Sequence, residues 1–236
     1  MTLILRDTEA IGRLHVLDHG LVELLDWMGD DLAIVEAAQA SFDKIPDGYG
    51  SKEQGILRFL MKEEHGVPFE HVVLKFRLRM PIFLARQYVK HRTSSWSEHS
   101  GRYSALEPLF YIPEPIDVRT QVGKPGRYSF EPVDVATAGD FLVSLEESCQ
   151  LAWDTYQAAL STGVAKELAR MVLPVNLYTT VVWTINARSL FNVIRLRVDS
   201  HAQREARVYA RALEQLASIV IPDTMSAFVE NERPKP

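Results

Sequence analysis

The clearest structural signal in the chain is the stretch His71-Val-Val-Leu-Lys-Phe-Arg-Leu-Arg-Met80. Apolar residues recur at every second position from Val72 to Met80, and three of the positions between them carry lysine or arginine. This two-residue period is typical of a strand with one buried and one exposed face. We expect the strand to end at Pro81, because proline cannot donate a backbone hydrogen bond.

A second alternating stretch covers residues 175–185 and predicts another strand. Immediately after it, Arg188, Asn192 and Arg195 recur at helical spacing, and apolar residues occupy the opposite face of the same predicted helix. The chain therefore places a row of polar side chains close to the end of a strand.

Weaker patterns predict the other elements. We expect strands at residues 13–18 and 21–25, and helices at residues 29–42, 51–64, 82–92, 135–160, 164–172 and 201–220, with a short helix after Pro222. Ser51 is expected to cap the helix at 51–64. The helix at 82–92 would carry Gln87, Lys90 and His91, while residues 93–133 would be irregular and residues 230–236 a frayed tail.

This order of elements is neither a repeating βαβ series nor a repeat array, which favours the α+β class. No linker or low-complexity segment divides the sequence. We therefore predict a single domain over residues 1–236, with a mainly antiparallel sheet flanked by helices.

Composition limits the possible function. The chain has 236 residues, of which 47% are hydrophobic and 24% charged, values typical of a soluble globular protein. A net charge of -5 argues against nonspecific nucleic-acid binding, which needs a basic face. We find no signal peptide and no apolar run of membrane-spanning length, so we expect a cytoplasmic protein that does not bind membranes.

Two segments are cationic within this acidic chain. Residues 82–104 hold four lysines or arginines and one carboxylate, and residues 186–207 hold five arginines and two carboxylates, so each has a balance of +3. Such segments favour capture of a small anion, whereas the alternative is a pair of solvated helix faces. The first segment also contains two histidines and several hydroxyl side chains, which makes a phosphate-binding site the better interpretation.

Other kinds of chemistry have weaker support. Glycine-rich dinucleotide and phosphate-loop patterns are absent, Ser100 has no evident base for a nucleophile, and the histidines lack metal-ligand spacing, so we expect no metal. Cys149 is the only cysteine and has no flanking cation that would activate its thiol. Trp96 and Tyr103 are either core residues or ring-stacking platforms, and for each alone the core is favoured.

The segment from 87 to 103 resembles the signature of the flavin-dependent thymidylate synthases, in which Arg-His-Arg is followed by seven residues and Ser. Here the match is Lys90-His91-Arg92, then Thr93 through His99, then Ser100. Further blocks resemble the family over most of residues 20–204: His65-Gly-Val-Pro-Phe-Glu-His71, Pro81-Ile-Phe-Leu-Ala-Arg-Gln87, Ser100-Gly-Arg-Tyr-Ser104, Arg170-Met-Val-Leu-Pro174, Asn186-Ala-Arg-Ser189 and Arg197-Val-Asp-Ser-His-Ala-Gln203.

The resemblance implies transfer of a methylene group from methylenetetrahydrofolate to dUMP, followed by reduction with a hydride from FAD that NADPH has reduced. It also implies that no protein cysteine attacks the uracil. A homotetramer with active sites shared between subunits is implied as well.

Carried over position by position, the resemblance assigns two sets of residues. The expected FAD contacts are His65, Val67, Glu70, Lys90, His91, Arg92, Glu98, Asn186, Arg188, Asn192 and His201. The expected dUMP contacts are Gln87, Lys90, Glu98, His99, Ser100, Gly101, Arg102, Arg170 and Arg197. Arg197 is the expected catalytic residue, because a permanently charged guanidinium beside the uracil would stabilise negative charge on the ring.

Two positions depart from the family pattern. Lys90 replaces the first arginine of the signature, which keeps the charge and loses the bidentate fork. Val67 stands where a hydroxyl residue can occur, so only a backbone contact would survive there. The competing hypotheses are a noncatalytic nucleotide or RNA-binding module that uses the same arginines, and a family member that keeps FAD but has lost turnover through Lys90.

Overall fold

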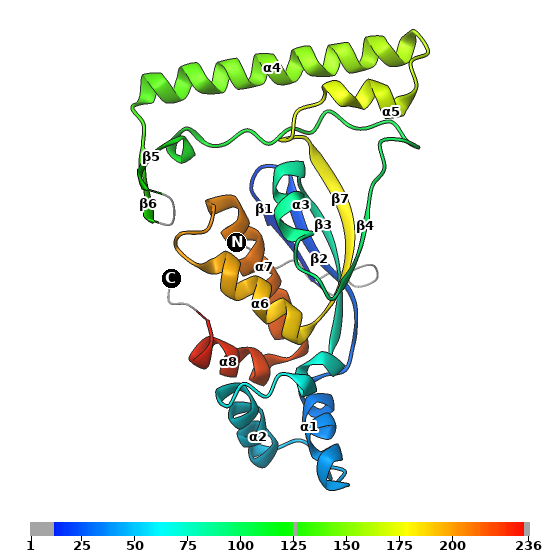
Figure 1. Cartoon of the computed structure of the whole chain (residues 1–236), viewed down its shortest axis with the longest axis vertical. Coiled ribbons are helices and arrows are strands. Elements are labelled where there is room, and N and C mark those ends of the chain that lie inside the picture. The colour runs from blue at the N-terminus through cyan, green and yellow to red at the C-terminus, as the bar shows by residue number, and fades with distance from the viewer. Residues whose placement is uncertain (1–11, 125–126, 234–236) are drawn as a thin grey trace.

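A five-stranded antiparallel sheet forms the centre of the fold (Figure 1). The computed structural model describes residues 12–124 and 127–233. The strand order is β1-β2-β3-β7-β4, and every neighbouring pair is antiparallel. The bounds are β1 Gly12–Val16, β2 Gly20–Met28, β3 Val73–Pro81, β7 Tyr178–Asn186 and β4 Ser94–Glu98. The predicted α+β class with an antiparallel sheet is confirmed.

The two strands predicted from alternation lie side by side in the middle of this sheet. Strand β3 pairs with β7 over nine residues, from Val73 opposite Asn186 to Pro81 opposite Tyr178. The apolar positions of both strands face the core, and Trp183 is the largest fully buried side chain there. Alternation is clean because helices cover one face of the sheet and leave the other face, which carries Lys75 and Arg77, accessible.

Three helices cover the core face: α3 (Ile82–Tyr88), α6 (Ala187–Val198) and α7 (Arg204–Val220) (Figure 1). Two tyrosines fix them with bonds to backbone carbonyls. Tyr88 donates to Ala206 across a 2.9 Å distance, and Tyr209 on α7 donates to Arg79 on β3. One hydrophobic core runs from Leu14 to Phe228, as a single domain requires.

A second group of helices lies at the lower end of the sheet (Figure 1). It consists of α1 (Asp31–Gln39), α2 (Ser51–Lys62), α8 (Pro222–Asn231) and two 3-10 helices, Ala40–Phe42 and Val67–His71. The Asp31 carboxylate accepts the backbone N–H groups of Asp223 and Thr224, each at 3.0 Å, and so caps the start of α8. This cap joins the last helix to the first one.

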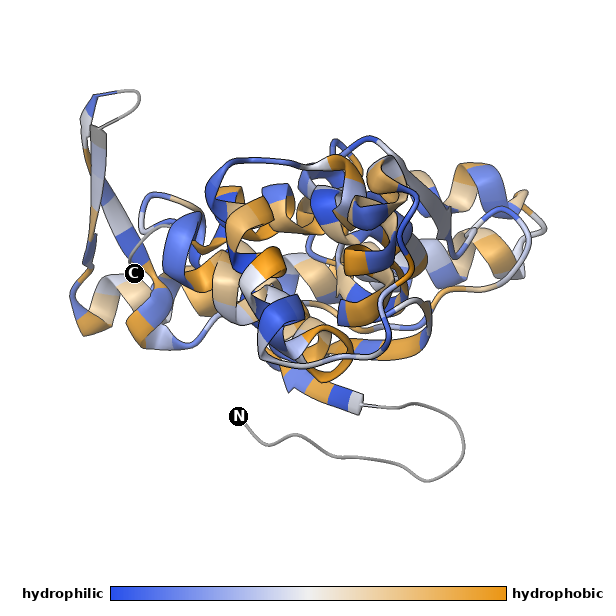
Figure 2. Cartoon of the chain, turned by 90° about the horizontal axis from the view of Figure 1, so that it is seen from below, coloured by the Kyte–Doolittle hydropathy of each residue, from blue (hydrophilic) through white to orange (hydrophobic). Residues whose placement is uncertain are grey.

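The upper end of the molecule is an elongated extension (Figure 1). It contains α4 (Val135–Ser161), α5 (Lys166–Ala169), two 3-10 helices (Pro115–Asp117 and Arg170–Val172) and a hairpin of β5 (Arg119–Lys124) with β6 (Arg127–Pro132). The 27-residue helix α4 buries only Ala138, Cys149 and Tyr156. The hairpin projects from the body and is mostly pale or hydrophilic in colour (Figure 2).

The prediction that residues 93–133 are irregular was wrong, because three strands lie there. Strand β4 joins the sheet along β7, but its sequence Ser94-Ser-Trp-Ser-Glu98 has one apolar side chain, Trp96, which packs on Trp183 at 6.1 Å. The β5–β6 hairpin is mostly exposed, so its sequence carries no buried apolar face. Neither β4 nor the hairpin alternates enough between apolar and polar residues to be recognised as strand from the sequence.

Three predicted helix ends were also wrong. The helix at 82–92 stops at Tyr88, where the chain turns and the His91 N–H bonds to the Tyr88 carbonyl at 3.0 Å. Gly50, and not Ser51, is the N-cap of α2, with the Glu53 carboxylate accepting the Gly50 N–H at 3.1 Å. The tail is helical through Asn231; residues 234–236 lie outside the described part.

No helix in the described residues is both long enough and apolar enough to span a membrane.

An ion triad centred on a buried carboxylate gives a test of the sheet. The Glu23 carboxylate on β2 is fully buried and binds two cations, Arg13 on β1 and Arg77 on β3, the latter at 2.9 Å. Glu23→Gln leaves both guanidinium groups without their counter-charge, so we predict a loss of about 2–4 kcal/mol in the free energy of unfolding, measured with urea. Lys75→Gln, an exposed change on the same face, should cost less than about 0.5 kcal/mol. Equal losses would contradict this account.

Candidate active site

The residues Lys90, His91 and Arg92 occupy a tight turn between α3 and β4. Two hydrogen bonds at His91 close the turn. Its N–H donates to the Tyr88 carbonyl, and its carbonyl accepts from the Ser94 hydroxyl at 2.9 Å. Thr93 then adopts a left-handed backbone with φ of 60°, which reverses the chain into β4. The outcome is that His91 points inward and is buried, while Lys90 and Arg92 are exposed.

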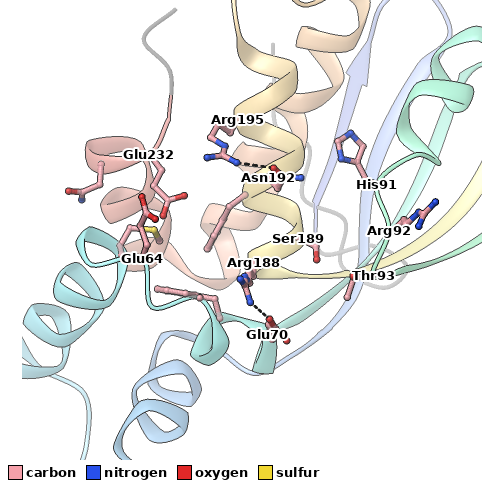
Figure 3. Close-up of a pocket in the computed structure, with 15 residues that line it drawn as sticks. Glu64, Glu70, His91, Arg92, Thr93, Arg188, Ser189, Asn192, Arg195 and Glu232 are labelled. Carbon is pink, nitrogen blue, oxygen red and sulfur yellow. Dashed lines mark hydrogen bonds and ion pairs between the residues drawn. The ribbon is translucent and has the colours of Figure 1, made fainter.

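A cavity, which we call the α6 cavity, opens beside this turn (Figure 3). It has a volume of about 740 Å³, within the range of cofactor sites. Its lining comes from α2, the 3-10 helix Val67–His71, the turn, α6 and the end of α8: Met61, Glu64, Gly66, Phe69, Glu70, His91, Arg92, Thr93, Arg188, Ser189, Phe191, Asn192, Arg195, Asn231 and Glu232.

Polar side chains are distributed unevenly within the α6 cavity. Arg188 forms an ion pair with Glu70, and Arg195 donates to the Asn192 amide oxygen at 3.1 Å. The carboxylates of Glu64 and Glu232 lie at the opposite end from His91 and Arg92 (Figure 3). A long ligand would therefore meet cations and an imidazole at one end and carboxylates at the other.

Close packing positions Arg188. A Cβ atom at Gly66 would lie 2.5 Å from Arg188 Nε, so a larger residue there would displace the guanidinium from its present position. The Asn186 side chain accepts the Ser189 N–H at 2.8 Å and so caps α6. Asn186 thus orients the helix that carries Arg188, Asn192 and Arg197.

Arg197 links α6 to the turn. Its guanidinium donates to His91 Nε2 and to the Gln87 carbonyl, both at 3.3 Å. Burial, and next the positive charge of Arg197, lower the pKa of His91 from 6.5 to about 4. The imidazole is therefore neutral at pH 7, and because Nε2 accepts a hydrogen bond, its proton resides on Nδ1.

A second cavity, which we call the α3 cavity, lies near the other end of β7 and has a volume of about 670 Å³. It combines two arginines, Arg86 and Arg170, with an apolar wall. Its lining is Ile82, Ala85, Arg86, Val89, Glu98, His99, Gly101, Leu106, Glu167, Arg170, Met171, Leu173, Pro174, Val175, Leu177, Tyr178 and Thr179.

Pairing of β4 with β7 determines the polar side of the α3 cavity. The Thr179 hydroxyl donates to Glu98 Oε1 at 2.9 Å, and the His99 N–H donates to the Thr180 carbonyl at 2.8 Å. Gly101 is buried against Arg170, since an added Cβ would lie 3.3 Å from Arg170 Cδ. The cavity thus offers fixed acceptors and two guanidinium donors.

Twelve of the eighteen predicted site residues fall into three groups. Glu70, His91, Arg92, Arg188 and Asn192 line the α6 cavity, as predicted for one ligand, and Glu98, His99, Gly101 and Arg170 line the α3 cavity. Glu98 was predicted to contact both ligands but lines the α3 cavity and not the α6 cavity. Gln87, Asn186 and Arg197 support the cavities through the bonds described above.

The remaining predicted residues lie outside both linings: His65, Val67, Lys90, Ser100, Arg102 and His201. His65 and Val67 flank Gly66 but are exposed. His201 is exposed and bonded to Asp199 at 2.9 Å, and Arg102 pairs with Glu167 at 3.6 Å. A single chain does not bring these six side chains into either cavity.

Several lining residues were not predicted. Arg86 and Arg195 lie in the two cationic segments, so their charge was a usable signal. Asn231 and Glu232 fall in the tail that we expected to be frayed. Nothing in the sequence indicated them. Helix α8 is held in place by its bond to Asp31, and Asp31 lies 192 positions before Asp223 in the chain.

Other candidate centres have structural explanations. Cys149 is buried and receives a bond from the Asn176 amide at 3.2 Å, away from both linings. His99 bonds to Ser104 at 2.6 Å and not to Ser100. Trp96 packs on the core, whereas Tyr103 is 75% exposed and is not a core residue. Among the described residues, no three metal-ligating side chains cluster.

Comparison with known proteins adds to this geometry. A family model described as thymidylate synthase complementing protein matches residues 23–223. A flavin-dependent thymidylate synthase from Tropheryma whipplei (strain TW08/27) is 38% identical over 226 residues, covering 91% of this chain and 94% of that protein. One from Kosmotoga olearia is 40% identical over 217 residues, covering 91% and 92%. The chain belongs to the flavin-dependent thymidylate synthase family.

Membership confirms the resemblance carried by the signature at residues 90–100, and the chain is an enzyme of methyltransferase type. A solved structure agrees. The UMP/dUMP methylase PolB from Streptomyces cacaoi, bound with 5-Br dUMP, superposes with a TM-score of 0.84 at 35% identity, covering 94% of this chain and 100% of that one. The family model ends at residue 223, before most of α8.

The pKa of His91 gives a pH test of the site. Between pH 6.5 and about 4 the unfolded chain protonates this histidine while the folded chain does not, so stability falls as pH falls through that range. From pH 7.5 to 5.0 the loss due to His91 should reach about 2 kcal/mol. We predict that His91→Gln removes this part of the pH dependence of urea unfolding. Identical slopes in the variant and the parent chain would contradict a neutral, buried His91.

Proposed function

We propose that the chain is an FAD-dependent thymidylate synthase that converts dUMP to dTMP with methylenetetrahydrofolate as carbon donor and NADPH as reductant. The observation that carries the proposal is that one chain segment contributes lining residues to both cavities. His91 and Arg92 line the α6 cavity, Arg86 and Glu98 line the α3 cavity, and Arg197 bonds to the turn between them. Family membership supports the same reaction.

The α6 cavity fits FAD. Its volume suits a dinucleotide, the guanidinium groups of Arg92, Arg188 and Arg195 suit a diphosphate, and two buried aromatic rings, Phe69 and Phe191, give an apolar wall. When bound and reduced by NADPH, FAD would supply the hydride that completes the methyl group. The neutral His91 would present its Nδ1–H to that ligand without adding charge.

The α3 cavity fits dUMP. Arg86 and Arg170 would bind the phosphate, because a guanidinium fork matches two phosphate oxygens. Glu98, held by Thr179, would accept hydrogen bonds from the sugar or the base. The apolar wall from Leu173 to Leu177 would cover the rest of the nucleotide.

Arg197 would act on the uracil. Its two hydrogen-bond partners, an imidazole nitrogen and a backbone carbonyl, are neutral, so its positive charge is not cancelled by a bonded carboxylate. A guanidinium of this kind stabilises negative charge that develops on the ring. Cys149 is buried outside both linings, which supports a reaction without a protein nucleophile.

A homotetramer with shared sites would explain the residues that one chain leaves outside the cavities. Helix α4 lies away from the sheet (Figure 1), and its apolar side chains Val135, Phe141, Val143 and Leu151 are exposed. Exposed apolar faces of this kind are typical of subunit contacts. Another subunit could then complete a site with Lys90, His65, Val67, Ser100, Arg102 or His201. A cytoplasmic location also stays a prediction.

Light scattering tests the assembly. Each chain has a mass of 26.8 kDa, and we expect a particle four times as heavy. Leu151→Asp on α4 should lower the measured mass, because it places a charge in the apolar contact. A monomeric parent chain would contradict shared sites.

A tritium-release assay tests the reaction. With NADPH and methylenetetrahydrofolate, the yellow FAD-bound protein should release tritium from 5-tritiated dUMP and form dTMP. At pH 8, Arg197→Gln should lower kcat by about 10²–10³ while FAD is retained, because it removes charge stabilisation in the transition state. Arg170→Gln should mainly raise KM for dUMP, because it removes a ground-state contact.

The controls separate the alternatives. Arg58→Gln, on the exposed face of α2, should change neither parameter. Colourless protein that fails to bind added FAD and releases no tritium would exclude the proposal. Binding of oligonucleotides with steep salt dependence, and no need for flavin, would favour the noncatalytic module instead.

A further inference from the structure

Four arginines gather outside both cavities, and we call them the arginine cluster: Arg119 on β5 and Arg204, Arg207 and Arg211 on α7. The three on α7 are separated by three and four residues, which places them on one face of the helix. None of the four lines the α6 or the α3 cavity. Their side chains therefore have no part in the sites described above.

Asp117 holds two members of the arginine cluster together. Its carboxylate pairs with Arg204 Nε at 2.8 Å, and its backbone carbonyl accepts from Arg119 Nε at 3.3 Å. Next to Arg204, the buried Glu205 accepts from the Tyr111 hydroxyl at 3.0 Å. These bonds hold β5, the segment before it and α7 together at the arginine cluster.

The positive charge of the arginine cluster exceeds the negative charge of the carboxylates beside it. Four guanidinium groups act against three carboxylates, Asp117, Asp199 and Glu205, which leaves +1. Among the described residues, only Arg204 of the four has a carboxylate within 4.0 Å. Glu214 also lies near, but it forms an ion pair with Arg233 at 2.7 Å.

The members of the cluster repel one another. Burial, and then the charges of Arg211, Arg119 and Arg204, lower the pKa of Arg207. Like charges held together in a partly buried place destabilise the folded chain unless an anion neutralises them. The fold thus maintains a charge arrangement that its own side chains do not balance.

We propose that the arginine cluster is a second anion site, which binds one phosphate monoester or free phosphate group. Such a group carries about two negative charges at neutral pH and would neutralise the excess positive charge of the arginine cluster. Guanidinium forks bind its oxygens in a bidentate manner, and several neighbouring forks favour a tetrahedral dianion over chloride. The proposal does not rest on the assignment of FAD or dUMP to the two cavities.

Isothermal titration with inorganic phosphate tests this site. The protein is first saturated with FAD and dUMP, and ionic strength is held constant with sodium chloride, so that the two cavities do not contribute. We expect the parent chain to bind phosphate and the double variant Arg207→Gln, Arg211→Gln to bind it at least about tenfold more weakly, because bonds to charged groups are lost. Arg58→Gln, the exposed control on α2, should bind as the parent does.

Two outcomes would overturn the proposal: no phosphate binding by the parent chain at millimolar concentration, or equal affinity in the parent and the double variant. Arg211→Gln alone serves if the double variant does not fold, because Arg211 is exposed. A weaker but measurable loss in this single variant supports the site, and an unchanged affinity counts against it.

A second pair of titrations distinguishes the sources of the phosphate. NADP⁺ and NAD⁺ differ by one phosphate monoester on the adenosine ribose. If NADP⁺ binds more tightly than NAD⁺ and the double variant abolishes the difference, the site takes a phosphate carried by a dinucleotide. If the two bind equally and inorganic phosphate still requires the cluster, the site takes free phosphate.

Discussion

The pairing of β3 with β7 is the constraint on which the rest of the structure depends. Each strand continues directly into a helix that carries site residues: β3 into α3 at Ile82, and β7 into α6 at Ala187. Backbone bonds seal both joints, from the Ile82 N–H to Leu177 and from the Ala187 N–H to Val72, each at 2.9 Å. Because the pairing is antiparallel, the two helices start at opposite ends of the same strand pair. The α3 cavity forms near one end, and the α6 cavity near the other.

Strand β4 then connects the two ends. The chain leaves α3, turns at His91 beside the α6 cavity and returns along β7 to Glu98 and His99 at the α3 cavity. A one-residue shift of β4 against β7 would reverse which of its side chains face Thr179, since strand side chains alternate. The register therefore fixes both the polar lining of the α3 cavity and the turn that meets Arg197.

The sequence predicted those parts of the fold in which burial imposes a period. The alternation of β3 and β7 predicted two central strands, and the helical spacing of Arg188 and Asn192 predicted the polar face of α6. The sequence did not predict β4, because its one apolar residue, the half-buried Trp96, does not make a repeating pattern. It also missed Glu232, since a docked terminus depends on a contact with Asp31 that is remote along the chain. The signature singled out His91, which lies beside the α6 cavity, but its burial, the bond from Arg197 and the lowered pKa needed coordinates.

The central claim is that two ligands meet across the link from Arg197 to His91. The absorbance spectrum of the FAD-bound protein, recorded during titration with dUMP, tests this claim most directly. We expect dUMP to shift the flavin bands with saturation, and we expect Arg170→Gln to move the same shift to higher dUMP concentration, because Arg170 lines only the α3 cavity. A flavin spectrum that dUMP leaves unchanged, in protein shown to bind dUMP, would contradict the account.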